Sequence, residues 1–301
     1  MAKTFFTKRR VCAFLIVSAF SIGQISVSNA DVLEDAHKER VTINAGDVTL
    51  GATLYRPASI SGDLPGIVTA HGSAPSTRED VGFYTYRALE MGFAVLSFDK
   101  RGAGESTGEY VPFAVNTSEE MMRDLAADVV YSIEWLAQQP GIDDTRLGLF
   151  GGSQAGWIMP LAASKEPLIK FIVTGEGAPV TAGEEAVHGD VGGDGEGWDR
   201  ARIHAADDAL WEYQGNHGFD PTPVLLELDV PTLWIFGLRD DVIPVYPSLE
   251  RLENLIRDGK TNNAIHIFPF GDHNFRNTAT GDRYDVRQVA QDWLTDIGVL
   301  E

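Results

Sequence analysis

The chain has 301 residues, of which 44% are hydrophobic and 23% are charged. This hydrophobic content excludes a disordered or low-complexity chain. The 44 acidic and 24 basic residues give a formal net charge of −20. Such a charge argues against binding to nucleic acid or to an anionic membrane surface, because both of these partners attract clustered cations.

The first 30 residues have the three parts of a secretory signal peptide. Cations come first, at Lys3, Lys8, Arg9 and Arg10. An apolar run over residues 11–22 follows, and Ser28 and Ala30 put small residues at the −3 and −1 positions before Asp31. The alternative, a membrane anchor, needs about 20 apolar residues. We therefore expect cleavage after residue 30 and export of residues 31–301 to the periplasm or the medium, with no stable membrane anchor.

The only cysteine, Cys12, lies inside this predicted signal peptide. A mature chain that begins at Asp31 would contain no cysteine. The sequence thus excludes disulfide bonds, thiol catalysis and cysteine metal ligands from the mature protein.

The mature chain begins with a hairpin pattern and continues as alternating strands and helices. Residues 40–43 and 48–55 flank the turn at residues 45–47, which predicts an antiparallel hairpin. Short apolar runs then predict strands at residues 66–70, 93–98, 146–150, 171–174, 232–236 and 264–268. Amphipathic segments predict helices at residues 79–91, 118–139, 154–165, 246–259 and 284–297. This alternation predicts one α/β domain over residues 31–301, with a mostly parallel sheet and helices on both faces.

One stretch, about residues 179–222, interrupts the alternation. It opens acidic and rich in glycine and has no strand pattern. Long insertions of this kind often cover a binding site. We expect a small cap over a pocket, with Trp198, Trp211 and Tyr213 in its wall; the alternative is a mobile surface loop.

A candidate nucleophile, Ser153, stands in the sequence RLGLFGGSQAG at residues 146–156. An apolar strand runs directly into the glycines, and a helix begins after the serine. A serine at a sharp strand-to-helix turn needs small neighbours, because its backbone is strained and the helix packs closely behind it. The alternative is a glycine-rich turn with an ordinary serine. Trp157, one helical turn further on, is a candidate for the pocket wall or for the core.

A serine nucleophile needs a base and an acid that orients the base. Asp240 and Asp241 both follow the strand at residues 232–236, and we favour Asp240 as the acid. His273 follows the last strand in a loop that contains glycine. The resulting order Ser, Asp, His is that of one hydrolase fold among the serine-triad folds.

Two backbone amides are the candidates for an oxyanion hole. The strand at residues 66–70 ends in His71-Gly72, and the amide of Ser73 follows. The second amide belongs to Gln154, the residue after the nucleophile. We interpret His71 as structural, because it precedes the serine in the chain and does not fit the order Ser, Asp, His.

The chain resembles the α/β-hydrolase superfamily, and within it the bacterial carboxylesterase-type members. The resemblance covers about residues 40–299 and rests on HGSAPSTRED, FDKRGAGESTG, GLFGGSQAGW, FGLRDDVIP and FPFGDHNF. It implies the α/β-hydrolase fold and a triad of Ser153, His273 and Asp240. It also implies that Asp99 and Arg101 form a pair that fixes a loop. Some relatives take the acid from the loop where Glu176 lies, and Ala155 replaces a glycine that is common in the family.

No cofactor is expected, since no phosphate-binding loop or dinucleotide fingerprint follows the first strand. The acidic residues at positions 190, 194, 196 and 199 do not match a calcium loop, and we expect a solvated loop and no metal.

The sequence therefore predicts an exported serine hydrolase that cleaves small carboxylic esters. The alternatives on the same scaffold are a peptidase or amidase, including an aminopeptidase with a short peptide substrate, and a thioesterase. A binding protein that has lost catalysis would need to lack a triad residue, and none is missing. The sequence makes no prediction of oligomeric state.

Overall fold

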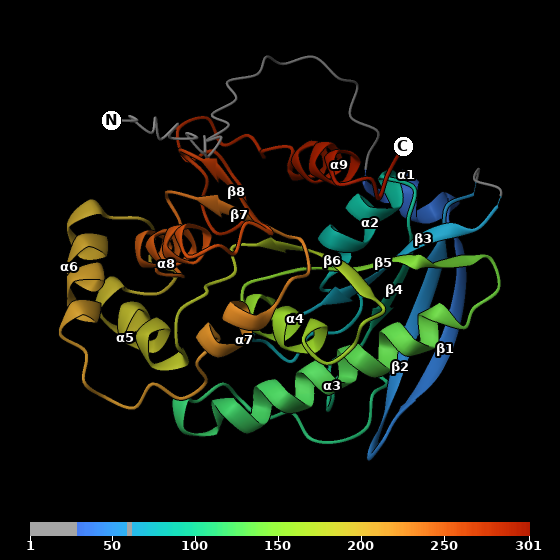
Figure 1. The fold of residues 1–301 in the computed structure, drawn as a ribbon, viewed down its shortest axis with the longest axis horizontal. Helices are drawn as coiled ribbons and strands as arrows, with labels where there is room; N and C mark the ends of the chain where they lie inside the picture. The colour runs from blue at the N-terminus through green and yellow to red at the C-terminus, as the bar shows by residue number, and fades with distance from the viewer. Residues whose placement is uncertain (1–28, 59–61) are drawn as a thin grey trace, which may run out of the picture.

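The structure, a computed structural model, describes residues 29–58 and 62–301. Its centre is an eight-stranded sheet in the order β1-β2-β4-β3-β5-β6-β7-β8 (Figure 1). The strands are β1 (His37–Ala45), β2 (Val48–Arg56), β3 (Leu64–Ala70), β4 (Ala94–Phe98), β5 (Ile142–Gly152), β6 (Ile169–Gly175), β7 (Thr232–Gly237) and β8 (Asn263–Phe268). The sheet confirms the predicted mostly parallel α/β architecture.

The sheet has an antiparallel start and a parallel remainder. β1 pairs with β2 and β2 pairs with β4 in antiparallel fashion. The pairs β3–β4, β3–β5, β5–β6, β6–β7 and β7–β8 are all parallel. Strands that are paired in parallel present their carboxyl ends at one edge of the sheet, where α/β proteins build their sites.

Helices cover both faces of the sheet (Figure 1). They are α1 (Asn29–Asp35), α2 (Gly82–Glu90), α3 (Ser118–Ala137), α4 (Ala155–Ala163), α7 (Thr222–Glu227), α8 (Val245–Arg257) and α9 (Val286–Asp296), with a 3₁₀ turn at Val115–Thr117. Alternate residues of β7 show how the strands serve both faces. Leu233 and Ile235 pack in the core with α2 and α9, whereas Trp234 and Phe236 pack with α8, because successive strand side chains point to opposite faces.

The stretch that interrupts the alternation forms two helices, α5 (Ala182–Gly192) and α6 (Arg200–Trp211). Thr181 caps α5: its side chain accepts a hydrogen bond from the amide of Glu184, and the Glu184 carboxylate accepts one from the amide of Thr181. Asp199 caps α6 by accepting from the amide of Arg202. The α5–α6 pair lies at one end of the molecule (Figure 1). These helices were not predicted individually, because glycine and acidic residues mask a helical pattern.

The predicted signal peptide lies outside the described residues, except that α1 begins at Asn29 and runs past the predicted cleavage position after Ala30. Among the helices of the described residues, none combines the length and hydrophobicity that crossing a membrane requires.

Candidate active site

The candidate residues lie in loops at the carboxyl edge of the parallel strands. Ser153 follows β5, Asp240 follows β7 and His273 follows β8. Ser73 follows β3, which lies next to β5 on the side away from β6 and β7. Residues that are as far apart as 73 and 273 in the chain thus meet at one edge of the sheet.

Ser153 occupies a strained turn. Its φ of 56° lies in the left-handed region, which costs free energy for a residue with a side chain. Its amide donates to the carbonyl of Gly175 on β6 at 3.0 Å. A Cβ on Gly152 would lie 1.9 Å from the Tyr84 hydroxyl. The turn therefore needs glycine before the serine, as the sequence pattern suggested.

The Asp240 carboxylate pairs with the His273 imidazole. His273 Nδ1 lies 2.8 Å from Asp240 Oδ2, and Asp240 Oδ1 accepts the amides of Val242 and Ile243 at 2.8 and 3.2 Å. Burial lowers the pKa of His273, but the facing Asp240 carboxylate outweighs it, so the pKa lies above the ordinary 6.5. In the structure Ser153 Oγ and His273 share no hydrogen bond; such contacts are often long in free enzymes.

Two further acids, Asp241 and Glu176, make different contacts from those of Asp240. Asp241 accepts the amide of Gly197 at 2.6 Å and does not pair with His273. Glu176, at the end of β6, also has a positive φ, of 51°, and is 1% exposed. Its Oε2 accepts the amide of Gly237 at 3.1 Å. Glu176 thus lies behind Asp240 and does not replace it.

The Glu176 and Asp240 carboxyl groups are close enough to influence each other's pKa. Burial and the Asp240 charge raise the pKa of Glu176 well above 4.5. Burial also raises the pKa of Asp240, but the His273 imidazole outweighs it and holds that pKa below 3.8. Two adjacent buried carboxyls do not both ionise readily. These directions favour the protonated form of Glu176 and the ionised form of Asp240.

The loop at residues 71–80 carries Ser73 and passes beside the nucleophile. A Cβ on Gly72 would lie 3.9 Å from Ser153 Oγ. His71 is 3% exposed and its Nε2 lies 2.6 Å from the carbonyl of Phe98. Burial lowers the pKa of His71 to about 4, so this histidine is neutral and structural. In the described part of the chain, the amides of Ser73 and Gln154 donate no hydrogen bond to protein.

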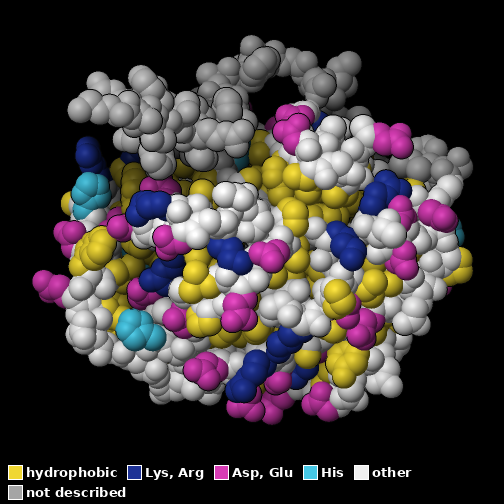
Figure 2. All heavy atoms as spheres, viewed as in Figure 1, with side chains coloured by type: hydrophobic (Ala, Val, Ile, Leu, Met, Phe, Trp, Pro, Cys, Tyr) yellow, Lys and Arg dark blue, Asp and Glu magenta, His cyan; other side chains and the backbone are white. Residues whose placement is uncertain are grey.

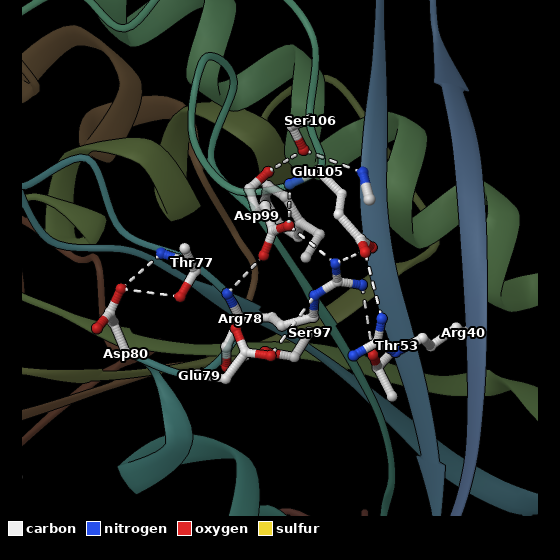
Figure 3. Close-up of polar contacts among 12 residues, drawn as sticks. Arg40, Thr53, Thr77, Arg78, Glu79, Asp80, Ser97, Asp99, Glu105 and Ser106 are labelled. Carbon is white, nitrogen blue, oxygen red and sulfur yellow. Dashed lines mark hydrogen bonds and ion pairs between the residues drawn. The ribbon is translucent and has the colours of Figure 1, made fainter.

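A buried polar network anchors the far end of this loop (Figure 3). Arg78 donates from its amide to Asp99 Oδ1 at 2.8 Å and from Nη2 to Asp99 Oδ2 at 2.9 Å. The same guanidinium contacts Glu105, which reaches Arg40 on β1. Asp99 therefore pairs with Arg78, whereas Arg101 pairs with Asp128 on α3 at 2.8 Å. Both residues fix loops, but the pair that the resemblance implied is wrong, because their side chains meet different elements.

A cavity of about 270 Å³ opens at Ser153. Its wall brings together Ser153, the two candidate oxyanion-hole residues, apolar side chains from four segments, and acids from α5 and the loop after it. The lining residues are Ser73, Phe113, Ser153, Gln154, Trp157, Glu185, Ala186, Gly189, Asp190, Asp194 and Val242. Residues of α5 and Ser153 thus line the same cavity.

The aromatic residues expected in the pocket wall take different places. Trp157 lines the cavity and is also part of the core: its Nε1 donates to the carbonyl of Val180 at 2.9 Å. The structure corrects the other three. Trp198 stacks on the guanidinium of Arg239, 3.7 Å from its ring centre, Trp211 is 73% exposed at the end of α6, and Tyr213 donates to the carbonyl of Asn216. None of these three residues lines the cavity, whose wall includes residues of α5 instead.

The acids expected to form a solvated loop, at positions 190, 194, 196 and 199, are all exposed. Glu185 does not belong to that group; it is half-buried and lines the cavity. Burial and the neighbouring Asp194 raise the pKa of Glu185 to about 7. Within residues 29–58 and 62–301, no three His, Cys, Asp or Glu side chains come together as a metal site. Glu185 and the buried Lys100 were not predicted from the sequence; for Lys100 the signal was a lysine two positions after the apolar strand β4.

Comparisons with known proteins agree with this architecture. The family model of the X-Pro dipeptidyl-peptidases (S15 family) matches residues 46–188. An esterase of Pyrococcus furiosus superposes with a TM-score of 0.65 at 18% identity, over 92% of this chain and 95% of its own. This superposition shows that the chain has the α/β-hydrolase fold.

Two curated relatives match this chain over part of their lengths. The hydrolase LUC6 of a Fusarium species is 32% identical over 151 residues, 48% of this chain and 35% of that protein. A protein of Chaetomium globosum named "Probable dipeptidyl-aminopeptidase B" is 26% identical over 262 residues, 81% of this chain and 26% of that protein. The chain thus spans about a third or less of these curated relatives.

Proposed function

We propose that this protein is a serine hydrolase that cleaves carboxylic esters through an acyl-enzyme. The observation that carries the proposal is a strained serine, with φ of 56°, in a cavity wall that also contains Ser73 and Gln154. Free amides at these two residues suit the negative oxygen of a tetrahedral intermediate. The Asp240–His273 pair at the same edge supplies a base with an orienting acid.

In this mechanism the hydroxyl oxygen of Ser153 attacks the ester carbonyl and its proton passes to His273 Nε2. Asp240 holds Nδ1 and stabilises the imidazolium. The tetrahedral intermediate collapses, the leaving alcohol takes the proton from His273, and an acyl-Ser153 remains. Water, deprotonated by His273, then hydrolyses the acyl-enzyme and restores Ser153. No cofactor enters these steps.

A second candidate function, aminopeptidase activity, is favoured by the acids of the cavity wall. Glu185, Asp190 and Asp194 line the same cavity as Ser153. Carboxylates in this position suit the ammonium of a peptide amino terminus. The match to the X-Pro dipeptidyl-peptidase family model supports this alternative, and a thioesterase would use the same triad.

The deciding experiment compares p-nitrophenyl esters of increasing chain length with acyl and aminoacyl p-nitroanilides. We expect ester hydrolysis that disappears in Ser153→Ala, with little anilide turnover. Efficient cleavage of aminoacyl anilides with weak ester turnover would transfer the assignment to a peptidase. Hydrolysis that survives in Ser153→Ala would refute the mechanism.

We also propose export of the mature protein, on the strength of the signal pattern in residues 1–30. Expression of the full chain should yield an exported protein whose amino-terminal residue is Asp31. An intact amino terminus in the cytoplasmic fraction would contradict this proposal.

A further inference from the structure

Lys100 lies in the loop after β4, and its ammonium is buried beside the proposed oxyanion hole. The residue is 2% exposed. Its Nζ donates to the carbonyls of Gly72 and Ala74, the latter at 3.2 Å, and to the side-chain oxygen of Gln154 at 3.0 Å. A single cation thus contacts the segments that follow both β3 and β5.

These acceptors lie next to, or on the same residue as, the two backbone amides of the proposed oxyanion hole. Gly72 and Ala74 are the neighbours of Ser73 on either side, and Gln154 itself provides the second amide. Tyr110 adds a hydrogen bond from its hydroxyl to the carbonyl of Ser73 at 2.5 Å. The Ser73 peptide is therefore held from both sides, and Lys100 ties it to the residue after the nucleophile.

The ammonium has no carboxylate partner in the described part of the chain. The adjacent acid, Asp99, is taken by Arg78, and the adjacent Arg101 takes Asp128. Burial lowers the pKa of Lys100 to about 8. A buried cation without a counter-ion is costly to the folded state, so a purely structural role would be filled equally well by a neutral donor. Lys100 lies beside the proposed oxyanion hole, where its positive charge would stabilise the negative charge that develops on the substrate oxygen.

We propose that Lys100, assisted by Tyr110, is the positioning residue of the oxyanion hole: it holds the Ser73 and Gln154 amides in register and adds positive charge behind them. The inference rests on the proposed function, because it presupposes that Ser153 is the nucleophile. Lys100 acts through the loop and does not itself touch the substrate.

The test measures covalent labelling of Ser153 by a fluorophosphonate probe. Ser153 Oγ bonds to phosphorus, fluoride leaves, and the proton passes to His273, while the phosphoryl oxygen takes the place of the oxyanion. Because the probe needs neither ester nor peptide specificity, it reports on the hole under either candidate activity. The variants are Lys100→Met, Lys100→Arg and Tyr110→Phe. Lys170→Met serves as control, since Lys170 is exposed and donates only to the carbonyl of Pro167.

We expect Lys100→Met to lower the labelling rate by about 10- to 100-fold, less than the 10²–10³-fold lost when an oxyanion donor itself is removed. Lys100→Arg should recover most of this loss, because it keeps both charge and donors. Tyr110→Phe should lower the rate a few-fold, and it keeps the proposal testable if Lys100→Met does not fold. With the substrate that proves active, the loss should appear in kcat and not in KM.

Wild-type rates in Lys100→Met and in Tyr110→Phe, or a loss confined to KM, would overturn the inference while leaving the proposed function intact. Failure of the wild-type protein to label at Ser153 would refute the proposed function, and the inference with it.

Discussion

Replacing Glu176 with glutamine tests which of two buried carboxyl groups carries the proton. Glutamine is neutral and close to glutamate in size, so the substitution copies the protonated state that the raised pKa of Glu176 favours. If Glu176 is protonated, the electrostatic environment of His273 does not change. We then expect the acidic limb of the pH profile of kcat/KM to move by less than about 0.5 pKa units, a free energy of about 0.7 kcal/mol.

The alternative, an ionised Glu176, predicts a change in the pKa of His273 that can be calculated. His273 Nδ1 lies 2.8 Å from Asp240 Oδ2. For a Glu176 carboxyl on the other side of the Asp240 carboxylate, ordinary hydrogen-bond lengths give a separation of roughly 7 Å from the imidazole. An ionised Glu176 at this separation would stabilise the imidazolium by about 2.4 kcal/mol at an effective dielectric constant of about 20. Its removal would lower the pKa of His273 by about 1.7 units.

The assay is the pH dependence of kcat/KM for the preferred substrate, which falls as the pH drops through the raised pKa of His273, because only the neutral imidazole accepts the proton of Ser153. Glu166→Gln is the matched control, since Glu166 is a buried glutamate whose carboxylate accepts the amide of Leu168 away from the triad. A downward shift of more than one unit in Glu176→Gln alone would refute the assignment of the proton to Glu176.

Three further predictions address the acid, the loop anchor and the cavity. Asp240→Asn should lower kcat by about 10³–10⁴-fold, whereas Asp241→Asn should stay within a few-fold, because only Asp240 contacts His273; equal effects in steady-state assays would contradict the pairing. Arg78→Met should lower the free energy of unfolding by about 3–5 kcal/mol in urea titrations, because it leaves the buried Asp99 without its guanidinium, and a loss below about 1 kcal/mol would show that the pair is replaceable. KM for a substrate with a free ammonium should fall as the pH rises through about 7, where Glu185 ionises, and Glu185→Gln should abolish this trend; an unchanged trend would exclude Glu185 as its source.

Local patterns in the sequence were sufficient for the architecture. Alternation of short apolar runs with amphipathic segments predicted the strands and helices of the sheet, and the structure confirms a mostly parallel sheet covered on both faces. Such patterns are local, because strand and helix periodicities are set over a few residues. The strand-to-helix turn at Ser153 could be predicted for the same reason, because the small residues that it requires are neighbours of Ser153 in the chain.

The contacts that make the site could only be decided by the tertiary structure. Asp240 and Asp241 are adjacent and chemically identical, and only the direction of each side chain assigns one to His273 and the other to Gly197. The raised pKa of Glu176 depends on its burial and on Asp240, a residue 64 positions later in the chain. Periodicity carries no information about such distant pairs.

In the predicted cap, too, the sequence indicated the segment, and the tertiary structure decided which of its residues line the cavity. Composition predicted an insertion near residues 179–222 but pointed to its aromatic residues as the pocket wall. In the structure the acidic helix α5 faces Ser153, and Trp211 at the end of α6 faces solvent. Which helix covers the site depends on how α5 and α6 pack on the rest of the molecule. The sequence by itself determined the sheet and the candidate nucleophile, whereas burial and long-range contacts decided the charge, the proton positions and the wall of the cavity.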